Sequence, residues 1–140
     1  MNIRLYSNEE DYDAVCHWWT ERGMEPLPKN VLRSVGYIAH EGGKDIACAW
    51  LYMDYISGVA WFNLFVANPE AGGVEIRDAH AAIVSAFRSF AEKEGFVIMM
   101  AFYEQRSLAK LAQKQGFSVN HDSVTELFMG LSPQLVEVAV

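Results

Sequence analysis

The sequence is poor in cysteine and in positive charge, and it has no long hydrophobic run. Its two cysteines, Cys16 and Cys48, form no C-x-x-C pair, so neither a disulfide framework nor a zinc knuckle is indicated. No apolar run approaches the roughly 20 residues that a membrane-spanning helix needs. Residues 1–10 end in two glutamates and lack the apolar core of a secretory signal. We therefore expect a cytoplasmic protein that does not bind membranes.

The shortage of positive charge excludes a second class of function. The chain has 11 basic and 18 acidic residues and a formal net charge of -7. Such a chain repels the phosphate backbone of nucleic acids, so no nucleic-acid partner is expected. The four histidines are dispersed along the sequence and predict no metal site.

Apolar residues, in contrast, are abundant. Hydrophobic residues make up 51% of the 140 residues and aromatic residues 13%, which is enough for a real core and excludes global disorder. The length is ordinary for one domain and too short for two. We therefore expect residues 1–140 to form a single domain.

Hydrophobic periodicity and turn residues predict the order of the elements. We expect strands at 3–6, 35–40, 46–55, 59–67 and 96–102, helices at 8–21, 75–94 and 107–115, a helical turn at 29–33, and a closing hairpin of 117–119 with 124–131. Short connections make the three strands from 35 to 67 an antiparallel meander. The helix between 59–67 and 96–102 makes those two strands parallel neighbours. The fold class is α/β (α+β).

The helix at 8–21 carries two local predictions. Ser7 and Glu10 have the spacing of a capping box, which predicts its start. Trp18 and Trp19 are consecutive, so we expect only one of them to face the core and the other to line a cleft or a partner surface.

Two short segments connect this element order with a known family. With Leu108-Ala-Lys-Leu111 and Lys114-Gln-Gly-Phe117 in place, nearly the whole chain resembles the GCN5-related N-acetyltransferase (GNAT) family. The paired Trp18-Trp19, Gly23, the Pro26–Pro28 segment and the 66–70 turn look like those of small phage- or prophage-borne members. The resemblance implies a mostly antiparallel sheet of six to seven strands, three to four flanking helices and two splayed parallel strands at the centre.

The resemblance also implies a function and a cofactor site. GNAT proteins transfer an acyl group from acetyl-CoA to an amine, here a small molecule or a protein. The pantetheine arm would pair with backbone groups of Leu64, Phe65 and Val66 where the strands splay, and one N–H there would stabilise an oxyanion. The pyrophosphate would lie at the N-terminus of the long helix. GNAT-like domains often dimerise, so the resemblance allows a homodimer.

The phosphate loop departs from the family pattern. In Arg77-Asp-Ala-His80-Ala-Ala82 a histidine stands where glycine is usual, and Gly72-Gly73 lies several residues earlier. We expect a displaced loop in which Gly72, Gly73 and Arg77 contact the cofactor, because glycine lets backbone approach phosphate closely. Arg77 opposes the helix dipole, which favours a phosphate partner.

The usual acid is also missing. Ala112 stands where many members carry tyrosine, and Gln105 where asparagine is common. Substitutes for the acid are Tyr103, Ser107 and His80, and candidates for the base are Glu104, Asp54 and His40. The site predicted from this resemblance has the following members: Glu104, Tyr103 and His80 as catalytic residues, and Leu64, Phe65, Val66, Gly72, Gly73, Arg77, Gln105 and Ser107 as cofactor-binding residues.

Other interpretations stay open. His80 lies on the apolar stripe of the long helix and is either a packing residue or part of the site, and Glu104 is either a surface charge or an active-site carboxylate. The altered loop and the missing tyrosine also fit an inactive GNAT-like binding or structural protein, for example a phage-associated one. Residues 108–118 resemble the start of a helix-turn-helix motif, but the β-branched and acidic residues that follow predict a poor recognition helix.

Overall fold

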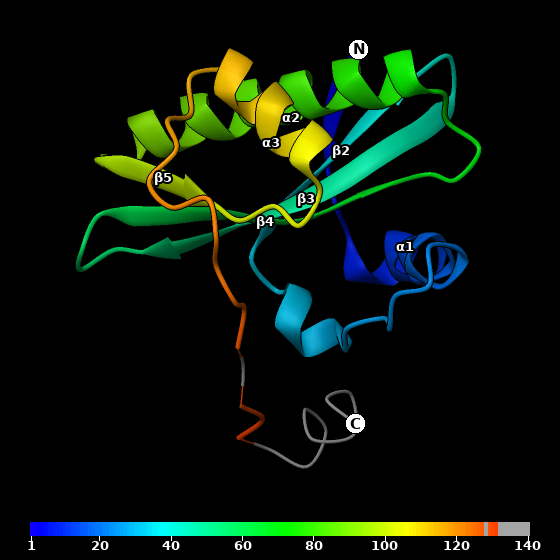
Figure 1. The fold of residues 1–140 in the computed structure, drawn as a ribbon. Helices are drawn as coiled ribbons and strands as arrows, with labels where there is room; N and C mark the ends of the chain where they lie inside the picture. Colours follow the sequence, from blue (N-terminus) through cyan, green and yellow to red (C-terminus); the bar gives the residue numbers. More distant parts are fainter. Residues whose placement is uncertain (128, 132–140) are drawn as a thin grey trace.

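The computed structural model describes residues 1–127 and 129–131 (Figure 1). Its elements, in chain order, are β1 (Asn2–Leu5), α1 (Asn8–Glu21), the 3-10 helix η1 (Lys29–Leu32), β2 (Val35–Glu41), β3 (Lys44–Asp54), β4 (Val59–Ala67), α2 (Gly73–Lys93), β5 (Ile98–Ala101) and α3 (Arg106–Lys114). The predicted order is confirmed from β1 to α3. No described helix is long and apolar enough to cross a membrane.

The described strands form one five-stranded sheet in the order β1-β2-β3-β4-β5. Neighbours from β1 to β4 are antiparallel, and β4 pairs with β5 in parallel. The predicted meander and parallel pair are therefore confirmed, as is the α/β class with a mixed, mostly antiparallel sheet.

Helices cover both faces of this sheet, with α2 and α3 on one side and α1 with η1 on the other (Figure 1). The α2-side core is built from β2, β3 and β4 together with Ala79, Ile83, Val84, Phe87 and Ala91 of α2. The α1-side core contains Val15, Trp18, Trp19, Leu32, Ile38, Cys48, Trp50 and Val66. Burial on both faces explains why β3 and β4 are almost continuously apolar instead of alternating.

The α1 helix corrects two local predictions. Trp18 and Trp19 are both buried, so the prediction that only one faces the core is wrong. Neighbouring helical residues lie about 100° apart, and an apolar stripe of that width accommodates both. Ser7 is the N-cap, but its side chain makes no capping bond; instead the Ser7 N–H donates to Asp11 Oδ2 at 2.8 Å.

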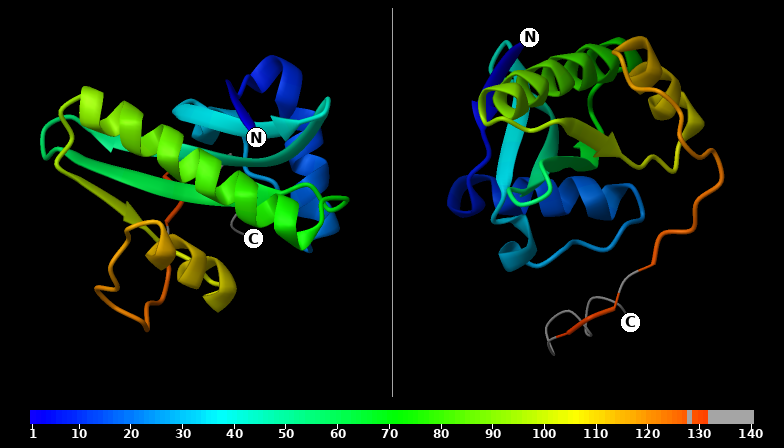
Figure 2. Two further views of the ribbon diagram at one scale, coloured as in Figure 1. Left: turned by 90° about the horizontal axis from the view of Figure 1, so that it is seen from above. Right: turned by 90° about the vertical axis from the view of Figure 1, so that its left-hand side faces the viewer.

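The end of the chain departs most from the prediction. Residues 117–119, 124–127 and 129–131 form no strand, so the predicted hairpin is wrong for the described residues and the strand count is five. After α3 the chain passes the end of β5 and then runs away from the sheet (Figures 1 and 2), and none of its described residues pairs with the open edge of β5. As a result β5 lies at the edge of the sheet and not at its centre, and it is only partly buried. The expectation for 132–140 lies outside the described residues.

Candidate active site

A gap between β4 and β5 is the first component of the site. The parallel pairing covers only Val59–Phe62 of β4 against Ile98–Ala101 of β5, so β4 continues for five residues beyond the end of the ladder. On its other side, β4 pairs with β3 at Cys48↔Val66 and at Trp50↔Asn63. Leu64 and Phe65 therefore stand opposite Ala49 alone, which is a β-bulge.

The bulge has an unusual backbone conformation. Leu64 has a φ of 62° and is the one described non-glycine residue with positive φ, a conformation that is uncommon for a branched side chain. Leu64 packs against the α1-side core and Phe65 against the α2-side core. The bulge thus lies in the part of β4 that extends beyond its ladder with β5, at the residues where the resemblance implied that the parallel strands splay; the bulge itself was not predicted.

One backbone N–H in the gap already has a hydrogen-bond partner within the protein. The Leu64 N–H donates to the side-chain oxygen of Asn63 at 2.8 Å. A ligand that used this N–H would have to displace the Asn63 side chain. Asn63 is therefore part of the candidate site, although nothing in the sequence distinguished it from other strand residues.

A buried polar group lies on the α2 side of the gap. The His80 side chain is fully buried. Its Nε2 lies 2.7 Å from the Tyr103 hydroxyl and its Nδ1 lies 3.0 Å from Gln115 Oε1. Phe65 packs edge-on against the imidazole with ring centroids 4.9 Å apart, so this His80–Tyr103–Gln115 group borders the bulge.

The partners of His80 determine its tautomer and charge. Gln115 Oε1 can only accept a hydrogen bond, so Nδ1 carries the hydrogen and donates to it, and Nε2 accepts a hydrogen bond from the Tyr103 hydroxyl. Burial lowers the pKa of His80, against the opposing effect of the Gln115 hydrogen bond, because a charged imidazole is poorly solvated in the core. Burial raises the pKa of Tyr103. At neutral pH the group is therefore an uncharged base that faces a protonated phenol.

The N-terminus of α2 is the second place where an anion was expected. Gly72 is the N-cap, but its N–H donates to Glu75 Oε1 at 2.9 Å, and Lys44 Nζ lies 3.6 Å from the same oxygen. Hydrogen bonding from Gly72 lowers the pKa of Glu75. A protein carboxylate thus occupies part of the position predicted for pyrophosphate, with a cation beside it.

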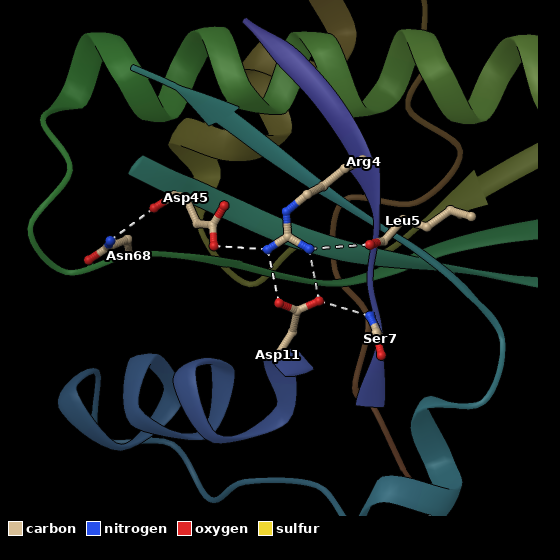
Figure 3. A network of polar contacts seen from close by, with 6 residues as sticks. All are labelled: Arg4, Leu5, Ser7, Asp11, Asp45 and Asn68. Atoms are coloured by element: carbon tan, nitrogen blue, oxygen red, sulfur yellow. Dashed lines mark hydrogen bonds and ion pairs between the residues drawn. The ribbon is translucent and has the colours of Figure 1, made fainter. Parts of the chain in front are cut away.

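The loop before α2 is held by a polar network (Figure 3). Arg4 binds the two Asp11 oxygens at 2.9 and 3.0 Å and Asp45 Oδ2 at 2.9 Å. Asn68 at the start of the loop donates to the Asp45 carbonyl at 2.9 Å. Burial acts to raise the pKa of Asp11, but the hydrogen bonds from Arg4 and Ser7 outweigh it and the pKa is lowered. The network links β1, α1 and β3 to the α2 loop.

The structure brings only some of the predicted residues together. His80, Tyr103 and Phe65 are in contact, and Gly72 and Gly73 form the start of α2. Arg77 is exposed and pairs with Asp78 at 3.5 Å instead of reaching the loop. Glu104, Gln105 and Ser107 are exposed at the start of α3, and Gln105 is its N-cap without a side-chain capping bond.

The two alternative general bases, Asp54 and His40, are placed in other parts of the sheet. Asp54 accepts hydrogen bonds from the backbone of Ile56 and Ser57, which makes it a turn residue of the β3–β4 connection. His40 lies in the β2–β3 pairing opposite Asp45. Gln115 was missed, because a polar residue at the end of a short helix carries no sequence signal for a buried contact with α2. Among the described residues no group of three or more His, Cys, Asp or Glu could hold a metal ion.

The fold is similar to those of several solved structures. A protein of Thermus thermophilus matches 94% of this chain and all of its own, with a TM-score of 0.70 and 16% identity. A Trypanosoma brucei acetyltransferase matches over 91% of this chain and 99% of its own, with a TM-score of 0.65 and 16% identity. The chain has a GNAT-like fold.

A third structure concerns the cofactor of these GNAT-like proteins. A putative acetyltransferase of Salmonella typhimurium, solved with acetyl-CoA, matches 86% of this chain and 80% of its own, with a TM-score of 0.66 and 14% identity. No family model matches the sequence, and no curated protein matches it. The GNAT likeness therefore rests on the three-dimensional fold.

Proposed function

We propose that the protein is an acyl-CoA-dependent N-acyltransferase that transfers an acetyl group to an amine. The observation that carries this proposal is the gap that opens beside the Leu64 bulge, where β4 extends past the end of its ladder with β5. Backbone groups along such a gap pair with the amides of a pantetheine arm as they would with a further strand. Acetyl-CoA supplies the activated acyl group as a thioester.

The acid–base chemistry is assigned to the His80–Tyr103 pair. The Tyr103 oxygen accepts a proton from the attacking amine while its own proton moves along the 2.7 Å contact to His80 Nε2. Gln115 accepts the Nδ1 hydrogen and supports the charge that His80 then carries. This role differs from the acid that the sequence suggested, because the Tyr103 proton points toward His80. A thiol with a pKa of about 8.5 leaves without a strong acid.

The phosphates are assigned to the start of α2 and to Lys44. Helix N–H groups and the dipole favour an anion there, and Lys44 already contacts the loop through the Glu70 carbonyl at 3.1 Å. Lys44 exchanges Glu75 for phosphate when acetyl-CoA binds. Glu75 therefore weakens cofactor binding in the protein as it stands.

Isothermal titration with acetyl-CoA tests the binding step. We expect saturable binding, and Glu75→Gln should bind several-fold more tightly because it removes the competing charge. Glu94→Gln is the matched control, since Glu94 is exposed at the other end of α2. The proposal fails if the native protein shows no heat of binding at millimolar acetyl-CoA.

Release of free CoA thiol in the presence of an amine panel tests the chemistry. Tyr103→Phe should lower kcat by at least about 100-fold, the usual size of a general acid–base contribution, with acetyl-CoA binding unchanged. Tyr55→Phe on the exposed β3–β4 turn should match the native protein. The net charge of -7 favours cationic acceptors, so the panel contains diamines and lysine peptides beside neutral amines.

A second candidate function is a GNAT-like binding or structural protein without catalysis, in a phage particle or against a host protein. The Glu75 carboxylate at the start of α2 and Ala112 in place of the usual tyrosine favour it. Stable co-purification with one partner protein, together with no acetyl-CoA binding, would support this candidate. Turnover that is lost in Tyr103→Phe would exclude it.

A further inference from the structure

Two aromatic side chains stack where β4 and β5 separate. Trp61 and Phe102 have ring centroids 5.7 Å apart and ring planes 15° apart. Phe62 and Ala101 form the last pair of the β4–β5 ladder, so each ring belongs to a residue next to the end of that ladder. The Trp61–Phe102 pair therefore borders the gap that is assigned to the pantetheine arm.

The Trp61–Phe102 pair lies on the face of the sheet opposite to α2. Side chains alternate between the two faces along a strand, and Phe62, Ala101 and Tyr103 all lie in the α2-side core. Trp61 and Phe102 therefore point to the α1 side, where α1 and η1 lie away from β5 (Figure 1). Neither ring belongs to the α1-side core. Phe102 is 46% exposed and Trp61 is partly exposed, so the pair is open to a ligand.

The surface around the pair is uncharged. Four positions adjoin Trp61 on this face of the sheet: Tyr52, Val59, Asn63 and Met100. None of them is a carboxylate that would hold a second ammonium group. The Tyr52 hydroxyl already donates to the Val31 carbonyl at 2.9 Å, and the Asn63 oxygen accepts from the Leu64 N–H at 2.8 Å. The surface therefore suits a flat apolar group, which packs well against aromatic rings.

We propose that the Trp61–Phe102 pair binds an aromatic ring of the amine acceptor, so that the acceptor is an arylalkylamine. This inference rests on the proposed acyltransferase function and names its substrate class. Phe102 and Tyr103 are consecutive and lie on opposite faces of the sheet. An amine joined to its ring by a short flexible spacer therefore reaches the Tyr103 hydroxyl through the gap.

The chemistry of an arylalkylamine fits both halves of this arrangement. Its amino group is cationic in solution, and the net charge of -7 attracts it. Once neutral, the nitrogen attacks the thioester carbonyl, so that the amide C–N bond forms and the C–S bond breaks. The proton that the nitrogen loses to Tyr103 balances the proton that the CoA thiolate takes up. The products are the N-acetyl arylalkylamine and CoA.

Acceptor selectivity tests the ring contact. kcat/KM is measured at saturating acetyl-CoA for 2-phenylethylamine and for ethylamine, which lacks the ring. We expect the native protein to prefer 2-phenylethylamine at least about 10-fold, because the ring is taken out of water and stacks on two others. Trp61→Ala should lose most of this preference while its kcat/KM for ethylamine changes less than about 2-fold.

Two further variants keep the test open if Trp61→Ala does not fold. Trp61→Phe should retain most of the preference, because a ring remains, and Phe102→Leu should lower it about 3-fold. Tyr55→Ala is the matched control, since Tyr55 is an exposed aromatic residue at the β3–β4 turn, and it should keep the native preference. Circular dichroism and urea midpoints establish that each variant folds. Lower stability of Trp61→Ala with an unchanged preference would mean that the rings pack against the chain itself, which overturns the ring contact.

Direct binding separates the ring contact from the acyltransferase function. Ligand-observed NMR with 2-phenylethylamine and CoA should show binding to the native protein and to Trp61→Phe but not to Trp61→Ala. If this pattern appears without turnover of any amine, the ring contact stands and the acyltransferase function fails. Turnover with equal preference in the native protein and Trp61→Ala overturns the ring contact alone. Neither binding nor turnover overturns both.

Discussion

The two faces of the sheet each bury one ionisable side chain, and the two side chains differ in charge state. On the α1 side Asp11 is buried but keeps its charge, because Arg4 binds both of its oxygens. On the α2 side His80 is neutral, because burial lowers its pKa and neither of its partners, a phenol and an amide, supplies a negative charge. The pKa is lowered in both residues. The same direction of shift leaves a carboxylate ionised and an imidazole neutral.

The comparison extends to packing. The α1-side core is dominated by indole rings, with Trp19 stacked on Trp50 at 5.6 Å and Tyr6 edge-on to Trp50 at 5.0 Å. Within the described residues Trp50 Nε1 is the one buried side-chain polar atom without a hydrogen bond. The α2-side core, in contrast, satisfies the polar atoms of His80. The first face is therefore an aromatic core, and the second contains the buried polar group of the candidate site.

The largest expected effect comes from removing the centre of the aromatic core. Trp50→Ala should lower the free energy of unfolding by about 3–5 kcal/mol, because a fully buried ring leaves a cavity. Urea denaturation measures it, with the exposed Tyr55→Ala as control. A loss below about 1 kcal/mol would show that the α1-side face is not a packed core.

Removing the charge on the same face should have the next largest effect. Asp11→Asn should lower the free energy of unfolding by about 2–3 kcal/mol at pH 7, since Arg4 loses a two-point partner. Because the folded-state pKa of Asp11 is lowered, this contribution is present above about pH 4 and is lost as the pH falls further. Native and variant stabilities should converge as the pH falls through the lowered pKa of Asp11, whereas the exposed Asp13→Asn should follow the native protein throughout.

A single methyl group tests how tightly the aromatic core is packed. A Cβ at Gly36 would lie 2.8 Å from Trp50 Nε1 and 2.9 Å from Tyr6 Cβ. Gly36→Ala should therefore cost about 1–3 kcal/mol of stability. Gly73→Ala meets nothing within 4 Å and lies in the first turn of α2, so its stability should stay the same or rise slightly. Equal stabilities of the two variants would mean that the Trp50 ring gives way.

The smallest expected effect is a pH-dependent loss of stability caused by His80 on the α2 side. Since the folded-state pKa of His80 is lowered, the unfolded state binds more protons as the pH falls below about 6.5, and the native protein should lose stability. The slope contributed by this residue is at most about 1.4 kcal/mol per pH unit. Urea midpoints from pH 7 to 5.5 measure it. The slope should disappear in His80→Leu and persist in His121→Gln, and an unchanged slope in His80→Leu would place the titrating group elsewhere.

The sequence by itself determined the element order and the parallel crossover. Apolar periodicity located α1 at Asn8–Glu21 and β4 at Val59–Ala67 with the observed bounds, because these elements are long and strongly patterned. The predicted hairpin of 117–119 with 124–131 is not formed in the described residues. A strand forms only where the chain pairs with the edge of another strand, and the local sequence pattern does not show whether it does so. The resemblance predicted that β4 separates from its parallel neighbour near Leu64, Phe65 and Val66, but it predicted neither the bulge at Leu64 and Phe65 nor the Asn63 side chain that binds the Leu64 N–H.

Only the tertiary structure decided the composition of the candidate site. His80, Tyr103 and Gln115 come from α2, from the end of β5 and from the end of α3, and they meet because α3 packs against α2. No spacing in the sequence encodes that contact, whereas the arrangement of the helices over the sheet creates it. The charge state of His80 follows from the same packing, since burial and not residue type lowers its pKa.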